Sequence, residues 1–263
     1  MENSDTTFAL VTDINYLHKA KQTISDLRIK GKWLGDICLL TIDFNLDDNF
    51  KDYYNVIEVK KQPIDKQKLI DLYPVGGFSG TGEGREMTLP NQWEKLQIFD
   101  DYFRKWKRVI FVDAGMRIVD SVKYLLELDY EGHILLHYEE KTKFHNTLSK
   151  KNEQLLSKVK QDFGEKIDTE STYLNGSWIY DTNILDICNK SELIDAMYEY
   201  PLCHTNEMAL MQLVLHHRHG LMKEYPIKAS NGKYLFGYSD IDYPGTTWRD
   251  FCMIKYPVSI QFS

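Results

Sequence analysis

One stretch of the sequence decides the fold: Arg108-Val109-Ile110-Phe111-Val112-Asp113-Ala114-Gly115-Met116-Arg117-Ile118-Val119-Asp120. Its four consecutive apolar residues, 109–112, predict a strand that is buried on both faces, as in a parallel sheet covered by helices. Ligands of open α/β sheets bind just beyond the carboxyl ends of the strands, which is where Asp113 falls. Ala114 and Gly115 keep side-chain bulk away from that carboxylate. A turn-capping role for Asp113 is equally consistent with this stretch alone.

Other short apolar runs extend this strand into a sheet. Further strands are predicted at residues 8–12, 37–42, 56–59 and 133–137. Helices are predicted at residues 14–29, 91–105, 122–126, 147–163, 183–198 and 206–217. We expect the Asn175-Gly176 step to open another strand, and residues 234–262 to form an irregular, aromatic-rich tail. The alternation of strands and helices is typical of a single α/β domain with a mainly parallel central sheet flanked by helices.

The composition is that of an ordinary globular protein. The chain has 263 residues, of which 43% are hydrophobic and 27% charged, and its formal net charge is −7. Duplex nucleic acid requires clustered Lys and Arg, whereas the basic residues here are scattered among acids. No apolar run reaches the roughly 20 residues of a transmembrane helix, and residues 1–5 do not resemble a signal peptide. We therefore expect a cytoplasmic protein that binds no nucleic acid and has no transmembrane segment.

Cysteine and histidine spacing gives no metal motif. The four cysteines are far apart and form no Cys-x-x-Cys pair: Cys38, Cys188, Cys203 and Cys252. We expect them to be reduced and mostly buried. Four histidines lie close together in the sequence: His204, His216, His217 and His219. Two of them are adjacent and should point to different faces of a helix, and there is no His-Glu-x-x-His spacing, which argues against a zinc site.

Residues 60–91 interrupt the alternation of strands and helices. Three prolines and the glycine-dense run 76–85 prevent a regular element there. The glycines match neither the phosphate loop G-x-x-x-x-G-K-[ST] nor the dinucleotide turn G-x-G-x-x-G. A connection this long in a compact domain is usually functional or mobile, so we predict a flexible lid, with a surface loop of no function as the alternative.

Four segments, in consistent order along most of the chain, carry a resemblance to a known family: Leu10-Val11-Thr12-Asp13-Ile14-Asn15-Tyr16, Trp93-Glu94-Lys95-Leu96 ahead of residues 109–115, Leu174-Asn175-Gly176-Ser177, and Asn206-Glu207-Met208-Ala209-Leu210. These four segments are similar, in the same order, to four features of the GT-A nucleotide-sugar glycosyltransferases. In that family the first strand is followed by a Tyr, and a helix with a basic residue precedes a strand that ends in Asp-x-Asp. Further along the chain, one strand starts with Asn-Ala-Gly and one helix starts with Asp-Gln. The chain most closely resembles glycosyltransferase family 8, which contains glycogenin and bacterial lipopolysaccharide galactosyl- and glucosyltransferases.

This resemblance implies a single GT-A, Rossmann-like domain over residues 1–263. Its nucleotide-binding half would span about 1–120, and its acceptor-binding half and C-terminal tail about 121–263. The implied activity is that of a hexosyltransferase, moving a sugar from a nucleotide diphosphate donor, UDP-sugar above all, to a hydroxyl of a glycan, lipid-linked or protein acceptor. Retention of anomeric configuration and a homodimer are further expectations from the family.

Two other functions remain open. One is a non-catalytic sugar-nucleotide-binding protein with a degenerate metal motif. The other, less favoured, is a haloacid-dehalogenase-type phosphohydrolase, which also places an Asp after an apolar strand. That class requires a second Asp and a Thr where this chain has Gly115 and Arg117.

The resemblance also assigns the donor site. Nine residues would bind the sugar nucleotide: Leu10, Thr12, Asp13, Tyr16, Arg85, Lys95, Asp113, Ala114 and Gly115. The Tyr16 ring would stack on the base, since a base stacks on an aromatic face. Lys95 and Arg85 would neutralise the diphosphate, because a departing nucleoside diphosphate needs cations. Asp113 would contact the ribose or a metal, and Asn175 the hydroxyls of the sugar.

The metal motif departs from the family pattern. The second carboxylate of the family's Asp-x-Asp, normally the main ligand of Mn²⁺ or Mg²⁺, is Gly115 here, and the family's C-terminal metal-binding His is missing. A hard divalent ion prefers several oxygen ligands, so Asp113 with Asp240 or Asp242 could rebuild a site in part. Without a metal, Lys95, Arg85 or Arg249 would have to carry the phosphate charge.

Glu207 is a third departure, because the family has Gln at this position. A carboxylate close to the anomeric carbon suits a retaining transfer, so Glu207 and Asn175 are the predicted catalytic residues. The alternative is that Glu207 only complements the dipole at a helix start.

Overall fold

The structure is a computed structural model that describes residues 5–65, 67, 89–130, 132–148, 153–201 and 207–258. Its central sheet contains β1 (Thr6–Thr12), β2 (Asp36–Thr41), β3 (Val56–Val59), β4 (Arg108–Val112), β6 (Ile134–Lys143), β7 (Ser171–Asp181) and β8 (Met222–Glu224). The strand order is β3-β2-β1-β4-β7-β6-β8. A smaller sheet has the order β5-β10-β9, with β5 (Arg117–Ile118), β9 (Tyr234–Ser239) and β10 (Phe251–Tyr256).

Parallel pairing dominates the amino-terminal part of the central sheet. β1 pairs in parallel with both β2 and β4, and β2 with β3. β7 runs antiparallel to β4 and β6, whereas β8 is parallel to β6. This mixed, mainly parallel sheet confirms the predicted α/β fold.

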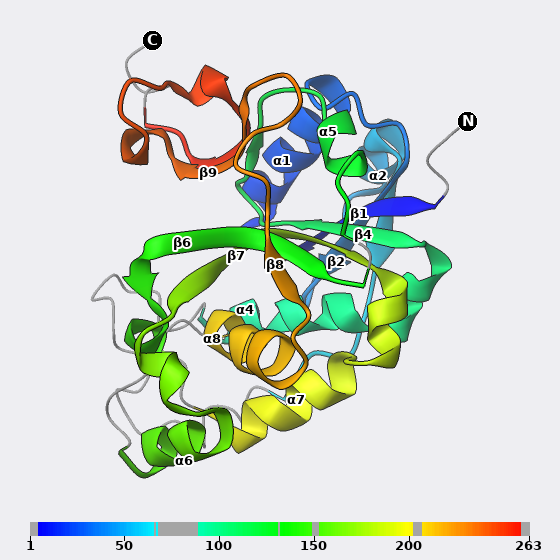
Figure 1. Ribbon diagram of the computed structural model, residues 1–263. Coiled ribbons are helices and arrows are strands. Elements are labelled where there is room, and N and C mark those ends of the chain that lie inside the picture. The colour runs from blue at the N-terminus through cyan, green and yellow to red at the C-terminus, as the bar shows by residue number, and fades with distance from the viewer. Residues whose placement is uncertain are drawn as a thin grey trace.

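Helices cover both faces of the central sheet (Figure 1). The α-helices are α1 (Leu17–Ile29), α2 (Asp48–Tyr54), α4 (Leu89–Gln92), α5 (Lys123–Leu126), α6 (Glu153–Phe163), α7 (Lys190–Glu199) and α8 (Glu207–Met211). The 3₁₀ helices are η1 (Trp93–Phe99), η2 (Asp101–Lys105), η3 (Phe144–Thr147), η4 (Glu165–Asp168), η5 (Thr182–Asp186), η7 (Asp240–Asp242) and η8 (Trp248–Asp250). A π-helical segment, η6 (Gln212–Arg218), continues α8. No helix within the described part of the chain is long and apolar enough to cross a membrane.

β4 is buried on both faces, as its sequence predicts. Val109 and Phe111 belong to the core beneath η1, α7 and α8, while Ile110 and Val112 belong to the core beneath α1 and α5. All four side chains are fully buried. Phe111 stacks on Trp178 of β7 with a ring separation of 3.7 Å. The end of β4 is therefore held rigidly from both sides and from its neighbouring strand.

The predicted helix at 91–105 is wrong in detail. After α4 the chain continues as two 3₁₀ segments, η1 and η2, separated at Asp100, whose backbone is extended. The Asp100 carboxylate caps η2 by accepting from the backbone N–H of Tyr102. It also forms ion pairs with Lys61 and Lys190. Because the Asp100 side chain caps η2 and binds two ammonium groups, it favours a break in the helix at this residue. The spacing of the apolar residues does not reveal this break.

Two predictions about strands are also corrected. β7 begins at Ser171, so Asn175 lies inside the strand rather than at its start, beside an irregularity in the pairing of β6 with β7. Residues 234–262 were expected to be irregular, but β9 and β10 form there and pair in parallel. The apolar residues of β10 are buried, which a strand requires and an irregular tail does not.

Candidate active site

Asp113 lies directly after β4, at the carboxyl end of the strand. Its backbone N–H donates to the carbonyl of Gly176 at 2.9 Å, and its own carbonyl accepts from the backbone N–H of Met116 at 3.0 Å. Gly115 completes the turn with a φ of +90°, a conformation that glycine adopts without steric cost. The turn leads into β5, which pairs antiparallel with β10. This short connection brings the C-terminal strands to Asp113.

Two ammonium groups bind the Asp113 carboxylate, one at each oxygen. Lys95 Nζ is 3.0 Å from Oδ1, and Lys255 Nζ is 3.0 Å from Oδ2. Lys255 also donates to the carbonyl of Ala114 at 3.1 Å. Burial alone would raise the pKa of Asp113, but Lys255 and Lys95 outweigh it and hold the pKa below its usual range. Asp113 is therefore ionised at neutral pH.

Lys95 also connects Asp113 to the two predicted catalytic residues, Glu207 and Asn175. Its Nζ is 2.7 Å from Oε1 of Glu207, and the Asn175 amide donates to that same oxygen at 2.7 Å. Glu207 is 1% exposed, and burial raises the pKa of its carboxyl despite Lys95. Its second oxygen, Oε2, has no hydrogen-bond partner among the described residues. The structure thus brings together Lys95 of η1, Asp113 directly after β4, Asn175 of β7 and Glu207 of α8.

Asp13 joins the predicted base-binding segment to the segment that carries Lys95. Its Oδ1 accepts from the backbone N–H of Tyr16 at 2.9 Å, and its Oδ2 accepts from the Asn91 amide at 2.7 Å. Because Asn91 is in α4, immediately before η1, Asp13 holds the start of α1 against the Lys95 segment. Asp13 is therefore a positioning residue in this structure.

Tyr16 lies at the N-terminus of α1, close to the turn after β4. The Lys19 ammonium is 4.7 Å from the centre of the Tyr16 ring. The Lys19 side chain also passes 3.4 Å from where a Cβ at Gly115 would lie. Leu10, by contrast, is fully buried in the core beneath α1, and the Thr12 hydroxyl donates to the carbonyl of Asp13. Any contact between Leu10 and a base would have to use its backbone.

The residues around Asp113 do not fit a divalent metal. Both carboxylate oxygens are engaged by ammonium groups, whereas Mg²⁺ and Mn²⁺ require several oxygen ligands. Asp240 is buried, and its Oδ1 accepts from the backbone N–H of Val258 at 2.7 Å. Within the described ranges, neither Asp113 nor Asp240 belongs to a group of three potential metal ligands.

Sequence reasoning missed Lys255 and Lys19. The apolar run 251–254 immediately before Lys255 could have indicated a strand, and hence a fixed lysine at its end. Nothing in the pattern of α1 distinguishes Lys19 from its other surface lysines. Arg85, Asn206, the glycine-dense run, His204 and Cys203 lie outside the described residues.

Comparison with known proteins defines the fold as that of GT-A glycosyltransferases. No family model matches the chain, and no curated protein matches it. Among solved structures, the bifunctional glycosyltransferase WbbM matches 97% of this chain and 46% of its own, with a TM-score of 0.60 and 12% identity. The galactosyltransferase LgtC, solved with donor and acceptor sugar analogues, matches 95% of this chain and 86% of its own, with a TM-score of 0.60 and 10% identity. The mannosyltransferase Ktr4p from S. cerevisiae matches 85% and 69%, with a TM-score of 0.52 and 12% identity.

These matches confirm the expected fold, at identities too low to transfer function. The chain spans less than half of the WbbM chain but most of LgtC. Membership of family 8 is not shown by any of them.

Proposed function

We propose that this protein is a hexosyltransferase that moves a sugar from a UDP-sugar to an acceptor hydroxyl with retention of configuration. The observation that carries the proposal is the position of Lys95, whose ammonium binds both Asp113 and Glu207 beside Asn175, at the carboxyl end of β4. Ligands of open α/β sheets bind at this edge. The glycosyltransferase fold gives independent support.

The two lysines would stabilise the departing diphosphate. Negative charge develops on the leaving oxygen as the glycosidic bond breaks, and fixed cations lower the energy of that transition state. A lysine ammonium has three N–H donors, and the two bonds of Lys255, to Asp113 and Ala114, leave one for a phosphate oxygen. In this proposal Asp113 orients the two ammonium groups, and the chain requires no Mn²⁺ or Mg²⁺.

Glu207 and Asn175 would act on the sugar. The amide of Asn175 offers a donor and an acceptor, which suits a pair of sugar hydroxyls. Glu207 would stabilise positive charge at the anomeric carbon through its carboxylate, as expected of an oxocarbenium-like transition state. Asn175 holds Glu207 in place through the 2.7 Å hydrogen bond.

The acceptor and the homodimer follow only from the family analogy. We propose a glycan, a lipid-linked sugar or a protein as the acceptor, and a cytoplasmic, homodimeric enzyme. A non-catalytic sugar-nucleotide-binding protein is the second candidate, because Gly115 removes the family's metal-binding carboxylate. The phosphohydrolase alternative is not favoured, since the matching structures are glycosyltransferases.

Calorimetric titration with UDP, followed by a screen of UDP-hexoses for hydrolysis, tests the proposal. We expect UDP to bind and at least one UDP-hexose to be hydrolysed, with or without Mn²⁺. Absence of UDP binding under both conditions would contradict the function. Binding without turnover of any donor, on any acceptor tested, would favour the non-catalytic candidate.

A further inference from the structure

A second cluster of ionisable side chains lies away from Asp113. Glu170 immediately precedes β7, and its Oε2 is 3.7 Å from Nε2 of His216 and 3.5 Å from Nε2 of His217, both in η6. One ligand atom from each of the three residues lies within 4.8 Å of the others. The two imidazole rings are 5.0 Å apart and nearly perpendicular.

Two adjacent histidines of the π-helical segment η6 reach one carboxylate. As neighbours in an α-helix they would point to different faces, but both imidazoles lie against the same carboxylate. A π-helix has a wider turn than an α-helix, and such segments are frequent at functional sites. Within this segment the Nε2 atoms of both His216 and His217 reach the same oxygen of Glu170.

The polar atoms of this cluster are buried without being satisfied. Glu170 Oε2 and His217 Nε2 are inaccessible to solvent and have no hydrogen-bond partner in the described ranges. The side chain of His217 is only 7% exposed. A buried polar atom without a partner is costly, so its persistence requires a reason.

The separations are too long for hydrogen bonds and suit a shared metal ion. Ligand atoms at 2.0 to 2.2 Å from a tetrahedral Zn²⁺ are about 3.3 to 3.6 Å apart. The distances from Glu170 to the two histidines lie close to that range. Two histidines and one glutamate are a ligand set that zinc accepts, with the fourth position open.

A neighbouring cluster lacks these properties. Cys188, Glu192 and His219 also lie close together, but Oε1 of Glu192 is already bound by His219 at 2.8 Å and by Arg218 at 3.2 Å. A carboxylate satisfied by a histidine and a guanidinium has less need of a metal. This cluster is therefore a suitable internal control.

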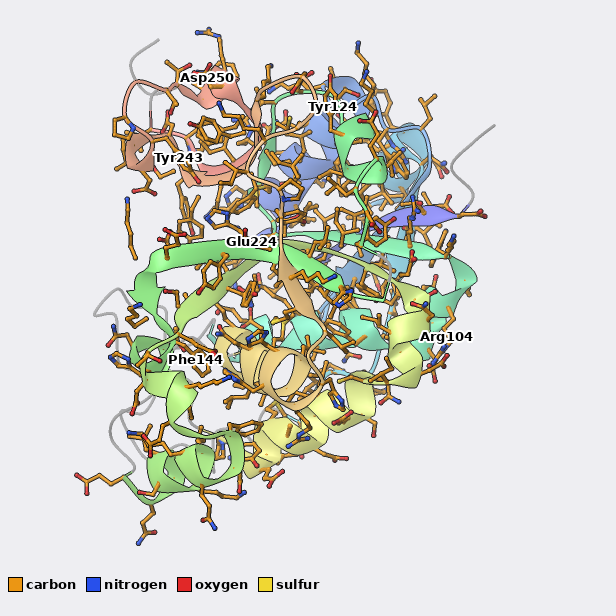
Figure 2. All side chains as sticks on the ribbon, viewed as in Figure 1. Arg104, Tyr124, Phe144, Glu224, Tyr243 and Asp250 are labelled. Carbon is orange, nitrogen blue, oxygen red and sulfur yellow. The ribbon has the colours of Figure 1, made fainter. Side chains whose placement is uncertain are left out.

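We propose that Glu170, His216 and His217 bind a Zn²⁺ ion, at a site distinct from the proposed sugar-transfer site. Glu170 and His216 also line a pocket of about 460 Å³ with Tyr138, Tyr173 and Glu224, which gives the ion a route from solvent. The pocket lies beside β8, where Figure 2 labels Glu224. The ion would tie η6 to the start of β7.

Titration of the chelator-treated 263-residue chain with ZnCl₂ and with CoCl₂ tests the site. We expect one ion to bind per chain, the melting temperature to rise with Zn²⁺, and Co²⁺ to give the visible absorption bands of a four-coordinate site. Glu170→Gln and His216→Asn should each weaken Zn²⁺ binding by about 100-fold or more, because even outer-shell changes cost 10- to 100-fold. His219→Asn, in the control cluster, should leave Zn²⁺ binding unchanged.

Circular dichroism of each metal-free variant shows whether it is folded. Glu170→Gln keeps the shape of a partly exposed side chain, so it provides a folded variant even if a substitution of the more buried His217 does not. Failure of the wild-type protein to bind Zn²⁺, or binding that survives both Glu170→Gln and His216→Asn, would overturn the proposal. UDP binding and sugar transfer do not enter these measurements, so the two proposals can fail independently.

Discussion

Lys255 places its ammonium 3.0 Å from Oδ2 of Asp113, although the two residues are 142 positions apart in the chain. The contact forms because the turn after Asp113 leads into β5, and β5 pairs with the strand that carries Lys255. The family resemblance leads one to expect a metal-binding carboxylate at position 115. This chain has Gly115 there, and the Lys255 ammonium is the nearby cation. The relationship between these two residues is the basis of the proposed metal-independent chemistry.

Replacement of Lys255 by Met should reduce sugar transfer while the protein stays folded. The variant loses one charge-assisted contact to the diphosphate, and such contacts contribute about 1.5–3 kcal/mol. We expect UDP affinity and kcat/KM to fall by roughly 10- to 100-fold. Lys141→Met, at an exposed position of β6, is the matched control and should change neither quantity. Equal activity of both variants would exclude Lys255 from the site.

Replacement of Glu207 by Gln separates binding from chemistry. The amide oxygen of the new side chain can still accept the hydrogen bond from Asn175, so the local structure should persist. Loss of the carboxylate should lower kcat by about 100-fold or more, as removal of a preorganised electrostatic group does. UDP affinity should change by less than about threefold, a small difference in free energy. An unchanged kcat would support the helix-dipole interpretation of Glu207.

Gly115→Asp restores the second carboxylate of the family motif but should not restore metal dependence. The φ of +90° at this position disfavours any side chain, by about 1–2 kcal/mol. The new Cβ would also lie 3.4 Å from Lys19. We expect a lower melting temperature and no stimulation of transfer by MnCl₂. Stimulation of the variant by Mn²⁺ would show that Asp113 can serve as a metal ligand after all.

Asp100 should contribute to stability in a pH-dependent way. Burial raises its pKa, but Lys190 and Lys61 outweigh burial and lower the pKa to about 2. The unfolded value is about 3.9, so the stabilisation is complete above that pH and is lost as the pH falls through 2. Asp100→Asn keeps a capping side chain and removes the charge. It should cost about 1 kcal/mol or less at pH 7, because the site is partly exposed.

Urea unfolding of the wild type and of Asp100→Asn at pH 7 and at pH 3 measures this difference. The gap in the free energy of unfolding should be smaller at pH 3. A difference in the free energy of unfolding that stays constant or widens at pH 3 would show that the ion pairs of Lys190 and Lys61 with the Asp100 carboxylate do not cause the stabilisation.

The sequence was sufficient for those strands of the central sheet that are uniformly apolar runs. The 109–112 run predicts a strand buried on both faces, and β4 is such a strand. The break at Asp100 and the C-terminal strands were not predicted. The break depends on two long-range partners, Lys61 and Lys190, and periodicity within the segment carries no information about them. The apolar run 251–254 is a local signal for β10, but the pairing of β10 with β5 and β9 cannot be read from it.

Part of the candidate site's composition can be read from local sequence, and part cannot. Lys95, Asp113, Asn175 and Glu207 lie within recognisable local segments, and the structure brings them into contact. The role of Lys255 follows only from strand pairing across the molecule. The approach of His216 and His217, in the π-helical segment η6, to Glu170 is likewise not indicated by residue spacing.

The most direct test of the central claim is calorimetric titration of UDP into the wild-type protein in EDTA, repeated in MnCl₂. If Lys95 and Lys255 neutralise the diphosphate, UDP binds in EDTA with an affinity within about threefold of that in Mn²⁺, and Lys255→Met weakens both titrations alike. Binding that appears only in Mn²⁺, and that Lys255→Met leaves unchanged, would contradict the account.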